Sequence, residues 1–191
     1  MTTVVEPVSY EDAHKFAERN QQRICLSLPP DLLSKEDRFL EKIIRAKVGS
    51  LKKLEMLYGL MDELSKATSK FTPCKKKCSD CCYYAVSVSD VEVAYIEKNT
   101  KHRCNKKLEP TRQFHGIPCP FLINGSCSIY NARPFVCRRH NTLTPNSYWC
   151  HHDRSDQPFP KLAFSNIDGA FDVIRLETNP GKPSDIRQLF A

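Results

Sequence analysis

Nine residues near the middle of the chain, CKKKCSDCC, place four cysteines close together at positions 74, 78, 81 and 82. A second series in PCPFLINGSCSIYNARPFVCRRH supplies Cys119, Cys127 and Cys137, and Cys150 lies a little beyond it. Thiols this dense predict a bound metal, because exposed thiols without one are readily oxidised. Disulfides are disfavoured, since adjacent Cys81 and Cys82 cannot bridge each other without strain.

The length and composition predict a soluble protein without a membrane contact. The 191 residues suit one domain, or a small domain with helical additions. No apolar run approaches the roughly 20 residues of a membrane-spanning helix, and the N-terminal MTTVVEPVSYEDAH does not resemble an export signal. We therefore expect a cytoplasmic protein. The formal net charge is +7, and we expect Lys75, Lys76, Lys77, Arg138 and Arg139 to offset the negative charge of nearby thiolates.

Two helices are predicted before the cysteines. The first begins near Tyr10, after the cap residue Ser9, and ends before Pro29-Pro30. Cys25, near its end, is interpreted as a small core residue. Apolar residues then recur at steps of three and four from Phe39 to Leu64, which predicts one long amphipathic helix over about residues 35–69 with a kink or break at Gly49-Ser50. Its apolar stripe either packs within the chain or contacts a protein partner or a second copy.

The spacing of the first four cysteines suggests how they bind. Cys74 and Cys78 would share one face of a helical turn, and Cys78-x-x-Cys81 is the spacing with which two thiolates bind one ion. Cys82 points elsewhere if Cys81 is a ligand. It therefore reaches the same metal only through an irregular backbone, or it serves a second site or a hydrogen-bonding shell.

The segments after this motif contain short regular elements. Residues 84–88 alternate like a strand, and Ser89 with Glu92 predicts a capped helix that turns Val91, Ala94 and Tyr95 inward. Asn124-Gly125 predicts a tight β-hairpin that holds Cys119 and Cys127. The turn at Arg133-Pro134 would bring Cys137 towards the first four cysteines. Arg133 is either a structural ion-pair partner or an anion contact beside the metal.

Other candidate ligands have weaker support in the sequence. His102 and Cys104 lie in a polar stretch, residues 98–116, that is interpreted as an exposed connection. His140, His151 and His152 could each replace one thiolate, or they are surface histidines beside a basic loop. A short helix is predicted over residues 167–177, and Asn179 to Pro183 is interpreted as a turn before a short terminal tail. Phe159, Leu162 and Phe164 are expected to pin this region to the core.

The order Cys-x3-Cys-x2-Cys-Cys, Cys-Pro-Phe-Leu, a glycine turn, Cys-Ser-Ile-Tyr, Arg-Pro and Cys-Arg resembles the YkgJ-type cysteine-cluster family over residues 74 to about 150. The resemblance implies zinc or iron chelation. It places the chelating cysteines at Cys74, Cys78, Cys81, Cys82, Cys119, Cys127 and Cys137, and Cys150 matches a further cysteine of some members. Relatives often have glycine where this chain has Lys77. Some larger proteins with a similar cluster are flagellin lysine methylases, but no dinucleotide or S-adenosylmethionine loop is visible here.

The donor set limits the metal without fixing it. Thiolates suit zinc and iron–sulfur clusters, whereas the lack of grouped carboxylates excludes Mg²⁺ and Ca²⁺. Seven or eight thiolates fit two zinc sites, or one 4Fe-4S cluster with spare cysteines. The crowded Cys81-Cys82 pair and the nearby cations favour iron–sulfur slightly.

Three functions remain open from the sequence. The leading one is a metal-binding module, structural or redox-responsive, that docks a partner. The second is an iron–sulfur or zinc-dependent enzyme, although no catalytic residues are predicted, because no paired-carboxylate, Ser/His/Asp or phosphate-binding arrangement is present. The third, less favoured, is a zinc-knuckle nucleic-acid binder.

The expected fold is mainly α, with a small irregular cysteine-rich metal-binding core that contains a short β-hairpin. We expect a helical N-terminal region over residues 1–72, a cysteine-cluster domain over residues 73–152, and a C-terminal extension with a short helix over residues 153–191.

Overall fold

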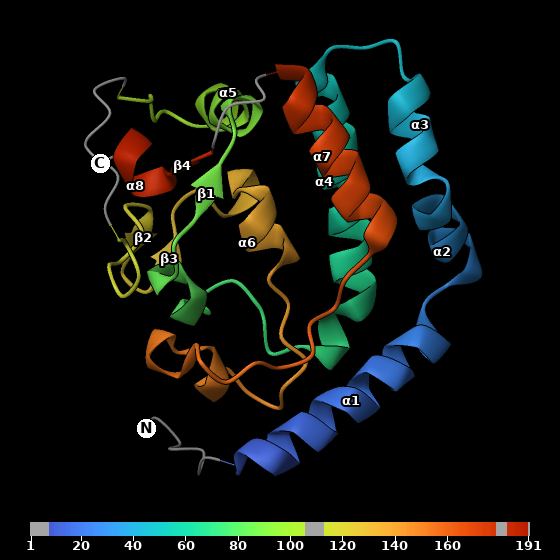
Figure 1. The fold of residues 1–191 in the computed structure, drawn as a ribbon, viewed down its shortest axis with the longest axis vertical. Helices are drawn as coiled ribbons and strands as arrows, with labels where there is room; N and C mark the ends of the chain where they lie inside the picture. The colour runs from blue at the N-terminus through green and yellow to red at the C-terminus, as the bar shows by residue number, and fades with distance from the viewer. Residues whose placement is uncertain (1–7, 106–112, 179–182, 191) are drawn as a thin grey trace.

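The computed structural model describes residues 8–105, 113–178 and 183–190. The protein is mainly helical, with two short antiparallel strand pairs and an irregular cysteine-rich region (Figure 1). This confirms the predicted fold class. The helices are α1 (Tyr10–Ser27), α2 (Pro30–Asp37), α3 (Phe39–Arg45), α4 (Ser50–Thr68), α5 (Asp90–Asn99), α6 (Phe135–Arg139), α7 (Ser165–Thr178) and α8 (Ile186–Phe190). The strands are β1 (Ser87–Val88), β2 (Leu122–Ile123), β3 (Ser126–Cys127) and β4 (Ser184–Asp185).

Helix α1 begins where its cap residue predicts. The Ser9 side chain accepts a hydrogen bond from the Asp12 backbone N–H, and the helix ends two residues before Pro29-Pro30. Its buried face includes Ala13, Ala17 and Ile24. Cys25 is exposed, so its interpretation as a core residue is wrong. The next residue along a helix is rotated by about 100°, which turns Cys25 away from the face that buries Ile24.

The single long helix predicted over residues 35–69 is also wrong. The chain forms three helices, α2, α3 and α4, which are interrupted at Arg38 and again over residues 46–49. The second interruption coincides with the break predicted at Gly49. The apolar periodicity does not reveal the interruption at Arg38, because α2, α3 and α4 all turn their apolar residues into the same core. Periodicity reports which face is buried and does not report a change in helix direction.

Helix α7 completes the first hydrophobic core. It packs against both α3 and α4 (Figure 1) and buries Ile167, Ala170 and Ile174. At Gly169 an added Cβ would lie 3.2 Å from a methyl group of Leu40, so glycine permits the close approach of α7 to α3. The helix predicted over residues 167–177 is therefore confirmed. The apolar stripe of α4 packs within the chain, against α7 and α5.

A second core lies beside the cysteine-rich region. Strand β1 pairs antiparallel with β4, so that Ser87 lies opposite Asp185 and Val88 opposite Ser184. The buried residues of this core are Val86, Val88, Ile96, Phe121, Ile129, Ala132, Ile186 and Leu189. The sequence predicted only a short tail at the C-terminus, whereas the structure forms β4 and α8 there and buries most of α8. The predicted turn at 179–183 lies outside the described residues, except for Pro183, as do residues 106–112 of the predicted connection.

Both cores draw residues from more than one of the three predicted segments. The first core contains residues of helices α1, α2, α3, α4 and α7. It also contains Val91, Phe135 and Leu143 of the cysteine region. The second joins the cysteine region to α8. None of the described helices is both long and apolar enough to cross a bilayer.

Helix α5 contributes Val91 to the first core and Ile96 to the second, and it carries a buried carboxylate. Ser89 and Glu92 form the predicted capping box, and Val91 is buried, whereas Ala94 is exposed and the expectation that it points inward is wrong. Glu92 is almost fully buried. Its carboxylate accepts hydrogen bonds from the Tyr58 hydroxyl of α4 (3.2 Å) and from the backbone N–H of Phe135 (2.7 Å), the first residue of α6. One side chain therefore ties three helices together.

Candidate metal centre

The first cysteine motif is a sequence of tight turns. Residues 74–79 are not helical, which corrects the expectation that Cys74 and Cys78 share a helical face. The backbone N–H of Cys78 donates to the carbonyl of Lys75 (2.9 Å), and Lys77 has a φ of 80°. A positive φ is strained for a residue with a Cβ and natural for glycine. The positive φ of Lys77 therefore gives a physical reason for the glycine that relatives often have where this chain departs from them.

Adjacent Cys81 and Cys82 lie on a single 3-10 turn over Asp80–Tyr83. The backbone N–H of Cys82 donates to the carbonyl of Ser79 (2.9 Å). This compact backbone lets both side chains line the same cavity. An irregular backbone of this kind is what we expected if Cys81 and Cys82 were to reach the same site.

The predicted hairpin positions the second cysteine motif. Strands β2 and β3 pair around Asn124-Gly125, both of which have positive φ values of 49° and 69°, as a type I′ turn requires. Cys127 lies opposite Leu122 in this pair. Cys119 precedes the hairpin, and its backbone N–H donates to the carbonyl of Cys82 (2.9 Å). This bond joins the two cysteine motifs directly.

One cavity of about 80 Å³ brings the two motifs together. It is lined by seven of the eight predicted ligands, Cys74, Cys78, Cys81, Cys82, Cys119, Cys127 and Cys137. Apolar side chains, including Val86, Phe121 and Ile129, form part of its wall. An apolar wall limits water access and so strengthens the electrostatic interactions inside.

The thiols surround this cavity and do not meet at one point. Within the described ranges, the group of three metal-binding side chains with all donor atoms within 4.8 Å of one another is His151, His152 and Asp153, and it contains no cysteine. In a tetrahedral zinc site with Zn–S bonds of about 2.3 Å, the sulfur atoms lie about 3.8 Å apart. The thiol arrangement is thus wider than that of a closed four-thiolate zinc site.

Burial holds most of these thiols in the protonated form. It raises the pKa of Cys119 to about 11 and also raises the pKa values of Cys78, Cys127 and Cys137. A bound cation reverses this effect, because it stabilises thiolates and releases their protons. The pocket is costly for bare thiolates and suited to thiolates that share a positive centre.

Cys81 and Cys82 act as a pair. The thiol of Cys81 donates to the sulfur of Cys82, which raises the pKa of Cys81 and lowers that of Cys82. The positive charge of Arg187 also lowers the pKa of Cys82. Cys82 is therefore the sulfur of the pair that ionises first.

The remaining cysteines lie outside the cavity lining. Cys150 is buried, and burial raises its pKa to about 12, with the charges of Cys74 and Cys78 acting in the same direction. It therefore lies close enough to Cys74 and Cys78 to interact with them. Cys104 packs against the second core, and Cys25 is exposed on α1.

The three candidate histidines separate into two groups. His140 lines the cysteine cavity, its Nε2 is buried without a hydrogen-bond partner among the described residues, and burial lowers its pKa to about 4. A neutral imidazole with an unpaired nitrogen is a suitable metal donor. His151 and His152 do not line the cavity and instead lie against Asp153 (3.4 and 3.2 Å).

The charges near the thiols match those expected only in part. Lys75 lines the cavity, as expected, but the two expected arginines pair with carboxylates of helices α4 and α7. Arg138 is buried and pairs with Asp62 of α4, and Arg139 pairs with Asp168 of α7. Among the described residues, Arg133 lowers the pKa of Cys127 by its positive charge, and Arg187 does so for Cys82 and Cys119. Sequence reasoning missed Arg187, since it lies about 50 residues beyond the last cavity cysteine.

Comparison with known proteins identifies the same region. Residues 73–156 match the family model CxxCxxCC, described as "Putative zinc- or iron-chelating domain". This match confirms the resemblance to the cysteine-cluster family and supports metal binding. No curated protein and no solved structure gives a significant match to the chain.

Proposed function

We propose that the cysteine cavity binds an iron–sulfur cluster that fastens the two cysteine motifs to each other. The observation that carries this proposal is the convergence of seven thiols, from residues 74–82 and 119–137, on one partly apolar cavity. Thiolates are the usual ligands of such clusters. The separation of the thiols supports a centre larger than one ion, and the positive charges of Arg133 and Arg187 suit the negative charge of a thiolate-bound cluster.

Zinc is the second candidate, because the same donor type binds it. The choice between the two metals is open to direct measurement. Protein purified without oxygen would be analysed for iron, acid-labile sulfide and zinc, and its visible spectrum recorded. Iron and sulfide in equal amounts with a broad visible absorption support the cluster. A colourless protein with stoichiometric zinc contradicts the cluster, and a folded protein with neither metal contradicts the whole proposal.

A structural or redox-responsive role follows from where the metal would lie. Residues 72–79 and 113–121 contain little regular structure, so a metal that joins them would contribute folding free energy. Oxidation or loss of the centre would remove this contribution and loosen both segments, which the backbone hydrogen bond between Cys119 and Cys82 still joins. Docking of a protein partner is a further part of this proposal. An iron–sulfur or zinc-dependent enzyme is the alternative to it.

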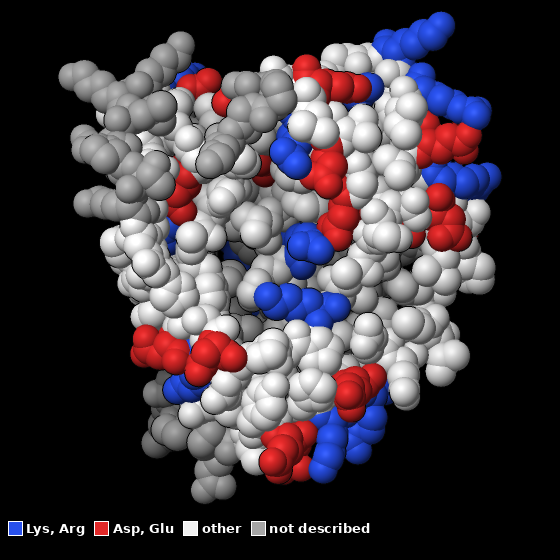
Figure 2. Space-filling view, in the orientation of Figure 1, with Lys and Arg blue, Asp and Glu red and all other residues white. Residues whose placement is uncertain are grey.

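Nucleic-acid binding has less support. On the face shown in Figure 2, acidic and basic side chains are interspersed, whereas a nucleic-acid site usually presents a basic stripe or patch. Filter binding across a salt series would test this alternative, and salt-dependent retention would revive it.

A further inference from the structure

The last segment of the chain contacts both cysteine motifs although it lies outside the matched region 73–156. Strand β4 pairs with β1, which follows the first motif by a few residues. The backbone N–H of Ile186 donates to the carbonyl of Val86 (2.8 Å). Ile186 and Leu189 are buried in the second core. In Figure 1, α8 and β4 lie on the same side of the molecule as the β2–β3 hairpin.

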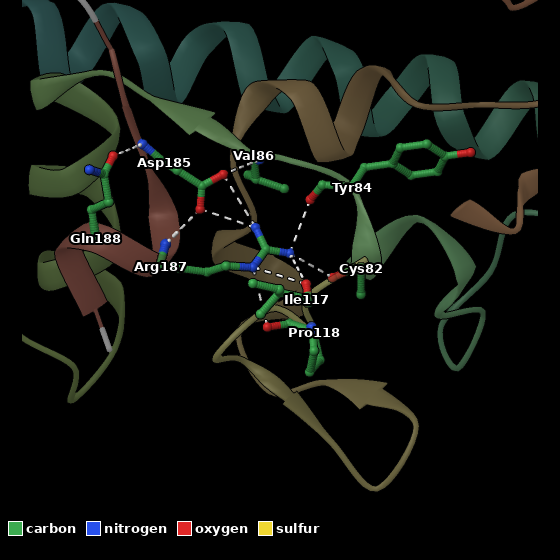
Figure 3. Close-up of polar contacts among 8 residues, drawn as sticks. All are labelled: Cys82, Tyr84, Val86, Ile117, Pro118, Asp185, Arg187 and Gln188. Atoms are coloured by element: carbon green, nitrogen blue, oxygen red, sulfur yellow. Dashed lines mark hydrogen bonds and ion pairs between the residues drawn. The ribbon is translucent and has the colours of Figure 1, made fainter. Parts of the chain in front are cut away.

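Arg187 makes the connection through its side chain (Figure 3). The guanidinium donates to the carbonyls of Cys82 and Tyr84, both at 3.0 Å. It also donates to the carbonyls of Ile117 (2.6 Å) and Pro118 (3.2 Å). Cys82 belongs to the first motif, and Pro118 immediately precedes Cys119 of the second. A single side chain therefore binds the backbone beside a cavity cysteine in each motif.

Asp185 fixes the guanidinium in this position. Its carboxylate lies 3.1 Å from Nη1 of Arg187 and also accepts the backbone N–H of Val86 (2.7 Å). Both charged side chains are largely buried, with 4% of the Arg187 side chain exposed. A buried cation is costly unless it is paired and hydrogen-bonded, and here the pair satisfies the guanidinium and four carbonyl groups together.

The charge of Arg187 also reaches the thiols. It lowers the pKa of Cys82 and opposes the effect of burial on the pKa of Cys119. The other arginine with such an effect on a cavity cysteine, Arg133, acts on Cys127.

We propose that Arg187 is a positioning residue of the metal centre, which fixes the Cys82 and Cys119 segments relative to each other. The C-terminal residues 184–190 are then an integral part of the metal site. This inference rests on the proposed function, because it assigns a role toward the metal that the cavity binds.

The test compares Arg187→Gln and Arg187→Lys with wild type and with a control that removes another buried cation. Lys53→Gln is the control, because Lys53 is buried in α4, pairs with Glu177 at 2.6 Å and does not line the cavity. Each protein is purified without oxygen, its iron, sulfide and zinc are measured, and the rate of metal release to excess EDTA is followed. Thermal melting gives the loss of stability of each variant.

We expect Arg187→Gln to release metal about 10 to 100 times faster than wild type, the factor by which loss of a residue that orients ligands usually weakens metal affinity. Arg187→Lys should be intermediate, since it keeps the charge and loses the planar set of donors. Lys53→Gln should release metal at the wild-type rate. If Arg187→Gln does not fold, the comparison uses Arg187→Lys. Metal release from this variant at the wild-type rate would refute the proposal.

Two other outcomes would also refute the proposal that Arg187 positions the metal centre. Wild-type release from Arg187→Gln would show that the guanidinium does not support the centre. Equal acceleration in Lys53→Gln, at a similar loss of melting temperature, would show that release follows general destabilisation. A wild-type protein without metal would refute the proposed function itself, and that result is read from the wild-type sample alone.

Discussion

Replacing Glu92 with alanine should be one of the most destabilising changes outside the cysteines. The carboxylate of Glu92 accepts four hydrogen bonds, from the backbone N–H and hydroxyl of Ser89, the hydroxyl of Tyr58 and the backbone N–H of Phe135. It ties α5 to α4 and to the start of α6, which carries Cys137. The substitution therefore acts on the fold and on the metal centre together.

The magnitude follows from the groups left behind. The Tyr58 hydroxyl and the Phe135 N–H lose a buried acceptor, at about 1–3 kcal/mol each. Loss of the helix cap at Ser89 adds about 1 kcal/mol. Removing an ionised carboxylate from the interior relieves part of this cost, so we expect a net loss of about 3 kcal/mol. For a chain of this size, that corresponds to a fall in melting temperature of roughly 6–12 °C.

Urea unfolding and thermal melting would measure this loss. The control is Glu63→Ala, which removes an exposed carboxylate paired with Lys35 and should leave the melting temperature unchanged, as is usual for surface pairs. The metal content of Glu92→Ala should also fall, because α6 loses an anchor. A Glu92→Ala protein within about 1 kcal/mol of wild type would refute the reasoning, because that is no more than a typical substitution costs.

The pH dependence of stability provides an independent test of Glu92. Burial raises the pKa of this carboxyl above its ordinary value of 4.5. The folded chain then keeps the proton to a higher pH than the unfolded chain, so its contribution to stability is full below pH 4.5 and is lost as the pH rises through the raised pKa. In Glu92→Gln this component should be absent. Equal pH profiles for the two proteins would contradict the raised pKa.

Three further predictions concern the cysteine region. Cys137→Ser should lose most of the bound metal and unfold the central region, whereas Cys25→Ser, on the exposed face of α1, should keep the wild-type metal content; loss of metal from the Cys25 variant would contradict the ligand assignment. Lys77→Gly should keep or raise the melting temperature, because glycine removes about 1–2 kcal/mol of left-handed strain and its entropy cost is smaller. The control Lys76→Gly should lower the melting temperature, because Lys76 has no positive φ. His140→Ala should change the visible spectrum or the metal content if its buried Nε2 is a ligand, and an unchanged spectrum and content would leave the cysteines as the ligand set.

Much of the site could be predicted because its signals are local. The Asn124-Gly125 turn acts over a few residues and predicted the β2–β3 hairpin that the structure shows. The cysteine spacing did not predict the backbone of the first motif, since residues 74–79 are not helical. The capping box of Ser89 and Glu92 is a four-residue signal and was also predicted correctly. Local sequence was sufficient for the hairpin turn and for the helix cap, which both depend on neighbours along the chain.

The failures arose where distant contacts decide the outcome. The division of residues 30–68 into α2, α3 and α4 depends on how each helix packs against α7, and apolar periodicity does not report this. The C-terminal residues 184–190 are too few to show periodicity, and they fold because β1 supplies a partner strand. Arg187 could not be found from spacing, since an arginine near the C-terminus is usually exposed and its carbonyl partners are 69 to 105 residues away.

Glu92 accepts hydrogen bonds from backbone N–H groups of the cysteine-rich region, and Arg187 donates hydrogen bonds to its carbonyl groups. A cysteine-rich region made of turns leaves backbone N–H and carbonyl groups that no regular element pairs, and buried groups of this kind must be satisfied. The buried anion of Glu92 accepts the N–H at the start of α6, near Cys137. The buried guanidinium of Arg187 donates to the carbonyl of Cys82 and to that of Pro118, the residue before Cys119. Each charge also has partners that fix it, so the backbone around the three cysteines is held by side chains outside the cysteine motifs. A metal would therefore bind to segments already brought together, and its loss should loosen the thiols before the two cores separate.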